Sequence, residues 1–181
     1  RTIKAGSWST LVLPFNMPIP EGWEVKKLST TNPPVHNDGN ITLRFDAVES
    51  IEAGVPYMVR VNEQCAAIMA SKASLNTLLT EPSYTTTCGS YKVTFVGSYT
   101  PGNLPVTEEG TAEYFFVSGN KFYRSTGPSN YMKAFRAYFK IEPTSADAPA
   151  LRSLSMRIGD ETIIESVEDE VTVVGIYNAN G

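Results

Sequence analysis

The sequence predicts an all-β fold: a two-sheet, sandwich-like domain of about ten short strands with little helix. Apolar and polar residues alternate with a period of two in several short runs, the pattern of half-buried strands. Turn-forming residues separate these runs, and the chain holds 13 Gly, 12 Pro and 9 Tyr. At 181 residues it fits one domain, large enough to bury about 70% of its unfolded surface.

The first strong element is the stretch from Trp8 to Phe15 (WSTLVLPF), which is too short and too apolar for a surface helix. We expect a deeply buried strand there, ending or bulging at Pro14 because proline donates no backbone hydrogen bond. A weak strand around Ile3 and Ala5 precedes it. After a turn at 17–22, Trp23 to Lys27 form a second short strand.

The next strands are bounded by clear turn signals. The polar loop from Thr30 to Asn40 holds two prolines and closes on Asp38-Gly39. Residues 41–45 then alternate strictly, with Ile41, Leu43 and Phe45 inward. The turn at 53–56 leads into another alternating run at 57–61.

The segment from Glu63 to Leu79 has two readings. Cys65, Ile68, Met69 and Lys72 stand at helical spacing, whereas three hydroxyl residues in the same segment weaken a helix. We expect strand and loop.

The later elements read more simply. Residues 91–96 form a strand closed by Gly97, and Gly119-Asn120 between two aromatic runs predicts a hairpin. In the run 135–141 the side chains of Phe135, Ala137, Phe139 and Ile141 share one side. Leu154, Met156 and Ile158 alternate in the same way.

The tail differs from the rest of the chain. Glu165 to Glu170 (ESVEDE) is an acidic run of the kind that links domains, and 171–177 then alternate like a strand. We therefore predict a β domain over 1–159 and an acidic linker with a strand-like tail over 160–181.

The two cysteines leave a choice open. Cys65 and Cys88 have neither the spacing nor the histidine neighbours of a zinc site. A disulfide between them would stabilise the fold by about 3 kcal/mol through loop closure. The alternative is two small apolar residues that never meet.

Several segments in this order resemble a known family. They are WSTLVLPF (8–15), AGVPYMV (53–59), TFVGSY (94–99), the FY and KAFRAYF segments within 122–139, and IYNANG (176–181). The chain resembles a β-rich module of secreted and surface proteins of Bacteroides-type bacteria, and its end resembles the front of their short C-terminal segment. The resemblance implies a secreted or cell-envelope location and an accessory role, with no catalytic residues. Since the chain begins at Arg1 without a signal-peptide segment, we expect a mature protein or an excised piece.

Little in the sequence predicts catalysis or a cofactor. His36, the only histidine, lies two residues from Asp38 on an irregular loop, which is poor geometry for a catalytic base and its partner. An EF-hand is excluded because Phe45 stands where its glutamate is required. No phosphate-binding or nucleophile motif is present, so we predict no catalytic, cofactor or metal residue. A hydrolase would need a facing pair among the turn acids Asp46, Glu49, Glu52, Glu108 and Glu109.

These observations favour a non-catalytic extracellular or cell-surface module that docks another domain or surface protein. The net charge of −4 argues against nucleic acid, and no apolar run is long enough to span a membrane. The alternative function is carbohydrate binding through aromatic residues near turns, which would form a flat platform: Trp23, Tyr84, Tyr99 and Tyr131. Aromatic rings in such places also cover the ends of a core.

Overall fold

The structure, a computed structural model, describes residues 2–65, 67–68, 82–108, 110–158 and 161–166. Every regular element in these residues is a β-strand, which confirms the all-β prediction. The described chain accordingly holds no apolar helix of membrane-spanning length. The expected arrangement of about ten strands in two sheets is not confirmed, because the described residues form sixteen strands in three sheets.

In chain order the strands are β1 (Ser9–Leu11), β2 (Met17–Pro18), β3 (Trp23–Leu28), β4 (Val35–Asn37), β5 (Asn40–Ala47), β6 (Ser50–Ile51), β7 (Tyr57–Val61), β8 (Ser83–Cys88), β9 (Tyr91–Ser98), β10 (Gly102–Asn103), β11 (Glu113–Ser118), β12 (Lys121–Arg124), β13 (Tyr131–Met132), β14 (Arg136–Pro143), β15 (Ser153–Ile158) and β16 (Glu161–Ser166).

Twelve of these strands form one continuous sheet in the order β1-β7-β3-β5-β15-β16-β12-β11-β14-β9-β8, with β4 added beside β5. Most neighbours are antiparallel, and the parallel pairs are β5 with β15 and β12 with β16. Two small sheets, β10-β13 and β2-β6, lie off this path.

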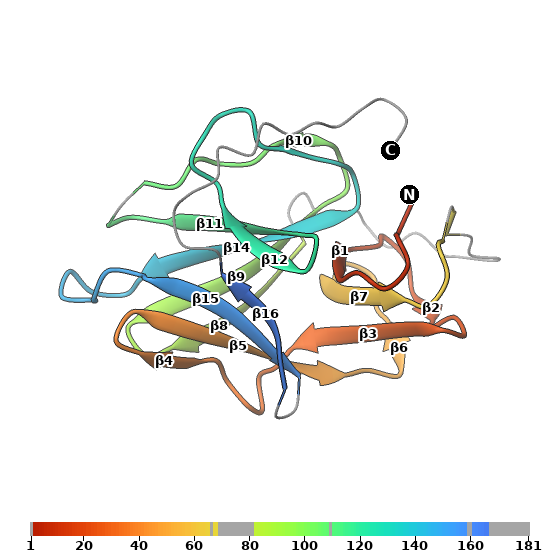
Figure 1. Ribbon diagram of the computed structural model, residues 1–181, viewed down its shortest axis with the longest axis horizontal. Coiled ribbons are helices and arrows are strands. Elements are labelled where there is room, and N and C mark those ends of the chain that lie inside the picture. The colour runs from red at the N-terminus through yellow and green to blue at the C-terminus, as the bar shows by residue number, and fades with distance from the viewer. Residues whose placement is uncertain (1, 66, 69–81, 109, 159–160, 167–181) are drawn as a thin grey trace.

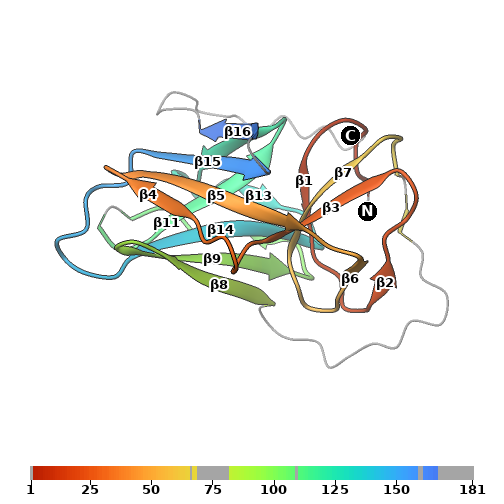
Figure 2. The same ribbon diagram turned by 90° about the horizontal axis from the view of Figure 1, so that it is seen from below.

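The long sheet folds back so that its two halves face each other. Figure 2 shows β5, β15 and β16 in one layer and β8, β9 and β14 in the other. The inner faces meet at Phe45 of β5, whose ring lies 6.3 Å from Phe95 and 6.2 Å from Phe139, edge-on to both. Phe95 and Phe139 in turn stack at 4.2 Å. This aromatic centre belongs to the larger of two hydrophobic clusters.

The smaller cluster lies among the N-terminal strands, which gather at one end of the molecule (Figure 1). It includes Leu11 of β1, Val25 of β3 and Val59 of β7. All three residues of β1 are buried, as expected for the stretch beginning at Trp8, although regular pairing covers only 9–11. β3 joins the clusters, because Val25 packs in the smaller one and Leu28 in the larger.

Small residues on β9 and β14 make room for the segment after β1. Gly97 and Ala137 are cross-strand partners on the inner side of the sheet. A Cβ atom on Gly97 would lie 2.9 Å from Val12 Cγ1. β9 continues to Ser98, so Gly97 lies inside the strand and does not close it as expected. The missing Cβ atom of Gly97 leaves room there for Val12.

The hairpin predicted at Gly119-Asn120 is confirmed, and both residues have positive φ, at 55° and 61°. Such angles are the requirement of a tight two-residue hairpin turn. Asn120 Oδ1 also accepts a hydrogen bond of 2.7 Å from the backbone N–H of Trp8. The turn thus attaches the second half of the sheet to the beginning of β1.

Alternation predicted most inward side chains correctly. Ile41, Leu43 and Phe45 are buried as expected. Phe135 is an exception: it precedes β14, has a φ of 58° and is only half-buried. Its left-handed backbone breaks the alternation one residue before the strand begins.

Two predicted segments fall partly or wholly outside the described residues. Of 63–79, the structure describes 63–65, where Cys65 forms an isolated bridge with Ile3, and 67–68. The strand-like run at 171–177 lies entirely outside. β16 falls inside the predicted linker and pairs with both β15 and β12, so the boundary drawn at residue 159 passes between two paired strands.

Candidate binding face

Four half-buried aromatic side chains lie on the outer side of three adjacent strands. They are Tyr123 of β12, Phe116 and Tyr114 of β11, and Tyr138 of β14, here called the aromatic row. Each alternates along its strand with core residues that point inward, namely Phe122, Phe115, Val117, Ala137 and Phe139. Because successive side chains on a strand point to opposite faces, the row belongs to the face turned away from the core.

The strand register brings the four rings into contact in pairs. Phe116 is the direct cross-strand partner of Tyr123, and their rings stack at 5.5 Å with an interplanar angle of 22°. Tyr114 and Tyr138 lie 6.1 Å apart with tilted rings. Phe116 and Tyr114 are two positions apart on β11, about 7 Å along the strand. The row therefore runs continuously across β12, β11 and β14.

Charged side chains share the outer face with the row. Lys140 of β14 is the cross-strand partner of Tyr114, and its ammonium lies 2.8 Å from Glu142. Lys92 of β9 lies 2.8 Å from the other oxygen of the same carboxylate. Burial alone would raise the pKa of Glu142, but hydrogen bonds and charges from Lys140 and Lys92 outweigh it and hold this pKa below its usual range. The carboxylate of Glu142 thus forms ion pairs with both Lys140 and Lys92.

A shallow open depression lies at the Tyr138 end of the row. Its volume is about 300 Å³, and its wall is formed by the end of β9, residues 100–105, Met132 and Tyr138. The two-stranded sheet β10-β13 forms one side of it. The aromatic row and this depression together make an extended surface rather than an enclosed pocket.

The four aromatics that the sequence proposed as a platform do not come together in this way. Trp23 packs half-buried against the smaller cluster, and Tyr84 packs against the larger one with Lys27 Nζ 4.8 Å above its ring. Tyr99 lies 6.3 Å from Phe135 and is half-buried. Tyr131, 52% exposed, stands on β13. Each ring has different neighbours.

The aromatic row could have been found from the composition of its strands, although not from the positions of the turns. In Tyr114-Phe115-Phe116-Val117 both parities of the strand are apolar or aromatic, whereas a strand facing water on one side shows polar residues there. The run Ala137-Tyr138-Phe139 repeats this feature. The sequence feature that indicates the row is therefore the presence of aromatic residues at the outward-facing positions of these strands.

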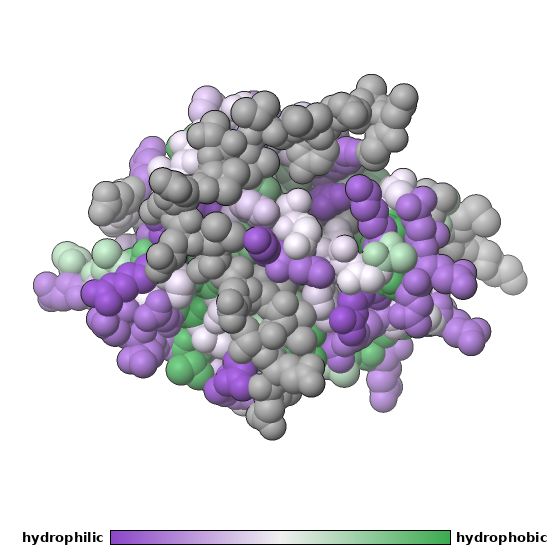
Figure 3. Space-filling model, viewed as in Figure 1, coloured by the Kyte–Doolittle hydropathy of each residue, from purple (hydrophilic) through white to green (hydrophobic). Residues whose placement is uncertain are grey.

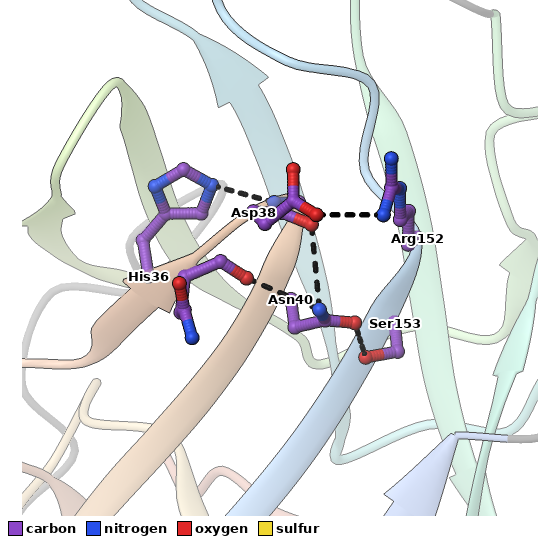
Figure 4. A network of polar contacts seen from close by, with 7 residues as sticks. His36, Asp38, Asn40, Arg152 and Ser153 are labelled. Atoms are coloured by element: carbon purple, nitrogen blue, oxygen red, sulfur yellow. Dashed lines mark hydrogen bonds and ion pairs between the residues drawn. The ribbon is translucent and has the colours of Figure 1, made fainter.

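His36 and Asp38 do not form a catalytic pair. His36 Nε2 accepts a hydrogen bond of 3.0 Å from the Gly39 N–H, and Asp38 pairs instead with Arg152 at 2.7 Å (Figure 4). Asn40 accepts a hydrogen bond of 2.6 Å from the Ser153 hydroxyl. These contacts fasten the β4-β5 turn to the beginning of β15, which is a structural role.

The candidate acids that the structure describes lie at the surface. Asp46, Glu49, Glu52 and Glu108 are all exposed, and Glu109 lies outside the described residues. Within the described chain no three His, Cys, Asp or Glu side chains are grouped so as to hold a metal ion.

Both cysteines are free thiols. Cys65 packs against the smaller cluster and Cys88 lies buried in the larger one, so the structure contains no bridge between them. Burial raises the pKa of the Cys88 thiol to about 11.

The chain matches no protein-family model, no curated protein and no solved structure.

Proposed function

We propose that this chain is a non-catalytic module that binds carbohydrate on the aromatic row, working outside the cell or on its envelope. The observation that carries the proposal is the row itself: four aromatic side chains in sequence across β12, β11 and β14, on the face turned away from the core. The extracellular location is supported by the family resemblance of the sequence.

The chemistry of the row suits sugars. A pyranose ring presents an apolar C–H face that packs on an aromatic ring, while its hydroxyl groups stay in water or bond to nearby polar groups. Three of the four rings belong to tyrosines, which carry a hydroxyl group at the edge of the apolar ring. Rings fixed on strands lose little conformational freedom when a ligand binds.

On the face shown in Figure 3 hydrophilic side chains make up most of the described surface, and apolar ones form small separate areas. Aromatic side chains left together on a sheet face are a frequent mark of binding sites.

A second candidate is the docking role that the sequence favoured, and β8 supports it. β8 ends the long sheet, and among the described residues its backbone pairs with β9 on one side. A partner strand can add to such an edge through main-chain hydrogen bonds. The edge carries alternating exposed Ser83, Thr85 and Thr87, which present no aromatic anchor for affinity.

A glycan array tests the proposal. The full chain, the double variant Phe116→Ala/Tyr123→Ala and the control Tyr131→Ala are compared, with each protein first shown to be folded by circular dichroism. We expect hits for the full chain and the control that fall by about tenfold or more in the double variant. An array without hits for the full chain, or hits that survive the double variant, would overturn the proposal.

A further inference from the structure

We infer that the carbohydrate bound on the aromatic row contains an N-acetylated amino sugar, whose acetamido group enters the depression beside Tyr138. This inference rests on the proposed function and assigns the chemical class of its ligand.

Tyr138 belongs to both the row and the depression. Its ring lies 6.1 Å from that of Tyr114 in the row, and the residue also forms part of the wall of the depression. A sugar that stacks on an aromatic ring carries its substituents around the edge of the sugar ring. One substituent of a sugar stacked on Tyr138 can therefore reach the depression while the sugar itself stays on the row.

One part of the depression is apolar. Val96 of β9 is the cross-strand partner of Tyr138 on the outer side of the sheet, yet only 7% of its surface is exposed. Leu104 and Met132, which line the same depression, are 5% and 8% exposed. These three side chains pack outside the two core clusters. A methyl group placed against them would lose contact with water, which favours binding.

The other part of the depression is polar. Thr100 and Asn103 line it and are exposed. The side-chain amide of Asn103 offers both hydrogen-bond donors and an acceptor. The Ser98 hydroxyl donates a hydrogen bond of 2.7 Å to the Thr100 carbonyl and so ties this loop to the end of β9. A ligand group that has both a donor and an acceptor suits this side.

An acetamido group matches both parts of the depression, because it joins a methyl group to an amide N–H and C=O. A hydroxyl group at the same position would bring no apolar atom to Val96, Leu104 and Met132. The methyl group of a 6-deoxy sugar would use the apolar part alone. The volume of about 300 Å³ is at the small end of the range for ligand sites, which suits a substituent of one sugar and not a whole oligosaccharide.

A glycan array that holds matched pairs tests this inference. The two members of a pair differ in carrying an acetamido group or a hydroxyl group at carbon 2: chito- beside cello-oligosaccharides, and glycans ending in N-acetylgalactosamine beside galactose. Isothermal titration calorimetry then gives the affinities of the full chain for tetra-N-acetylchitotetraose and for cellotetraose. We expect the acetamido member to bind about tenfold tighter. Glycans ending in rhamnose or in mannose are compared in the same way, and a preference for the 6-deoxy sugar without one for the acetamido group would overturn the inference.

Substitutions locate the effect in the depression. Gly102 lines it, has a backbone outside the left-handed region, and would place a Cβ atom with no other atom within 4 Å. Gly102→Leu should therefore partly fill the depression and lower the affinity for tetra-N-acetylchitotetraose about tenfold, while the affinity for cellotetraose stays unchanged. Asn103→Ala should reduce the same preference by about threefold or more. Gly127→Leu is the matched control, because its Cβ atom also meets no atom within 4 Å and Gly127 does not line the depression.

The outcomes separate this inference from the proposed function. Equal binding of both members of every pair, lost in Phe116→Ala/Tyr123→Ala, would overturn the acetamido ligand and keep carbohydrate binding. An array without hits for the full chain would overturn both. A preference for the acetamido group that both Gly102→Leu and Asn103→Ala leave unchanged would overturn its placement in the depression.

Discussion

The two thiols of this chain differ in burial, and burial lowers the fraction of Cys88 present as thiolate, the form of cysteine that reacts. Cys88 ends β8 with 1% of its surface exposed, and burial raises its pKa to about 11. Cys65 is half-buried, and its thiol donates a hydrogen bond of 3.1 Å to the Ala67 carbonyl. A reagent in solution therefore meets two different groups.

Iodoacetamide at pH 8 should label Cys65 well before Cys88. Only about one Cys88 in a thousand is thiolate at that pH, and its sulfur is also shielded by the core. Mass spectrometry of the peptides after timed labelling measures the two rates. Labelling in urea is the control, since both cysteines should then react alike. Equal rates in the native protein would contradict the buried placement of Cys88.

Gly97 has a steric role. Gly97→Ala would place a methyl group 2.9 to 3.0 Å from the side-chain atoms of the fully buried Val12, so one of them must shift. We expect a loss of about 1–3 kcal/mol in the free energy of unfolding, measured with urea. Gly127→Ala is the matched control, because no atom lies within 4 Å of its added Cβ. If Val12→Ala restores none of the loss in the double variant, the clash is not its cause.

At the scale of elements, β1 is fixed to the second half of the sheet by side-chain hydrogen bonds as well as by packing. Thr10 is 2% exposed, and its Oγ1 accepts a hydrogen bond of 2.9 Å from the Ala137 N–H of β14. The Val12 N–H donates a bond of 3.2 Å to the Phe135 carbonyl just before that strand. β1 thus spans the two halves, although it pairs regularly only with β7.

Thr10→Val tests this attachment. Valine keeps the shape of threonine but leaves the buried Ala137 N–H without its acceptor, which should cost about 1–3 kcal/mol of stability. Thr85→Val on β8 is the matched control, since the Thr85 hydroxyl bonds to Thr94 in an exposed position and valine suits a strand. A cost in urea unfolding no greater for Thr10→Val than for Thr85→Val would contradict the role given to the hydrogen bond.

Elements that obey local rules were predictable, and those set by distant contacts were not. The strand at Ile41, Leu43 and Phe45 and the turn at Gly119-Asn120 follow from alternation and from backbone preference alone. The aromatic row required knowing that β11 pairs with β14 as well as with its hairpin partner β12, and no local turn sets the pairing of β11 with β14. The positions of the predicted turns suggested a platform of Trp23, Tyr84, Tyr99 and Tyr131. The local sequence, however, does not show which aromatic rings will contact one another.

At the scale of the whole molecule, the burial of cysteine and tyrosine side chains makes the free energy of unfolding depend on pH in the alkaline range. Burial is the main cause that raises the pKa of Cys88, Tyr57, Tyr91 and Tyr99. Cys88 and Tyr91 belong to the larger hydrophobic cluster and Tyr57 belongs to the smaller one, so each of the two clusters contains a group with a raised pKa. Each group holds its proton more tightly in the folded chain than in the unfolded chain.

The sign of the pH dependence follows from this difference. Below the unfolded pKa values, about 8.5 for Cys and 10 for Tyr, these groups are protonated in both states and their contribution is complete. As the pH rises through these values towards the raised folded ones, the unfolded chain loses protons first. Stability must then fall, because it decreases with pH wherever the unfolded state binds fewer protons.

The free energy of unfolding in urea should therefore be nearly constant from pH 7 to 8 and decline steadily between about pH 9 and 11. Cys88→Ala should flatten the first part of that decline, since Cys88 has the lowest unfolded pKa of the four. Tyr131→Phe, which alters an exposed phenol, should leave the profile as it is. A stability that stays level to pH 11, or a decline that Cys88→Ala leaves unchanged near pH 9, would show that these buried groups keep their protons no more tightly than the unfolded chain does.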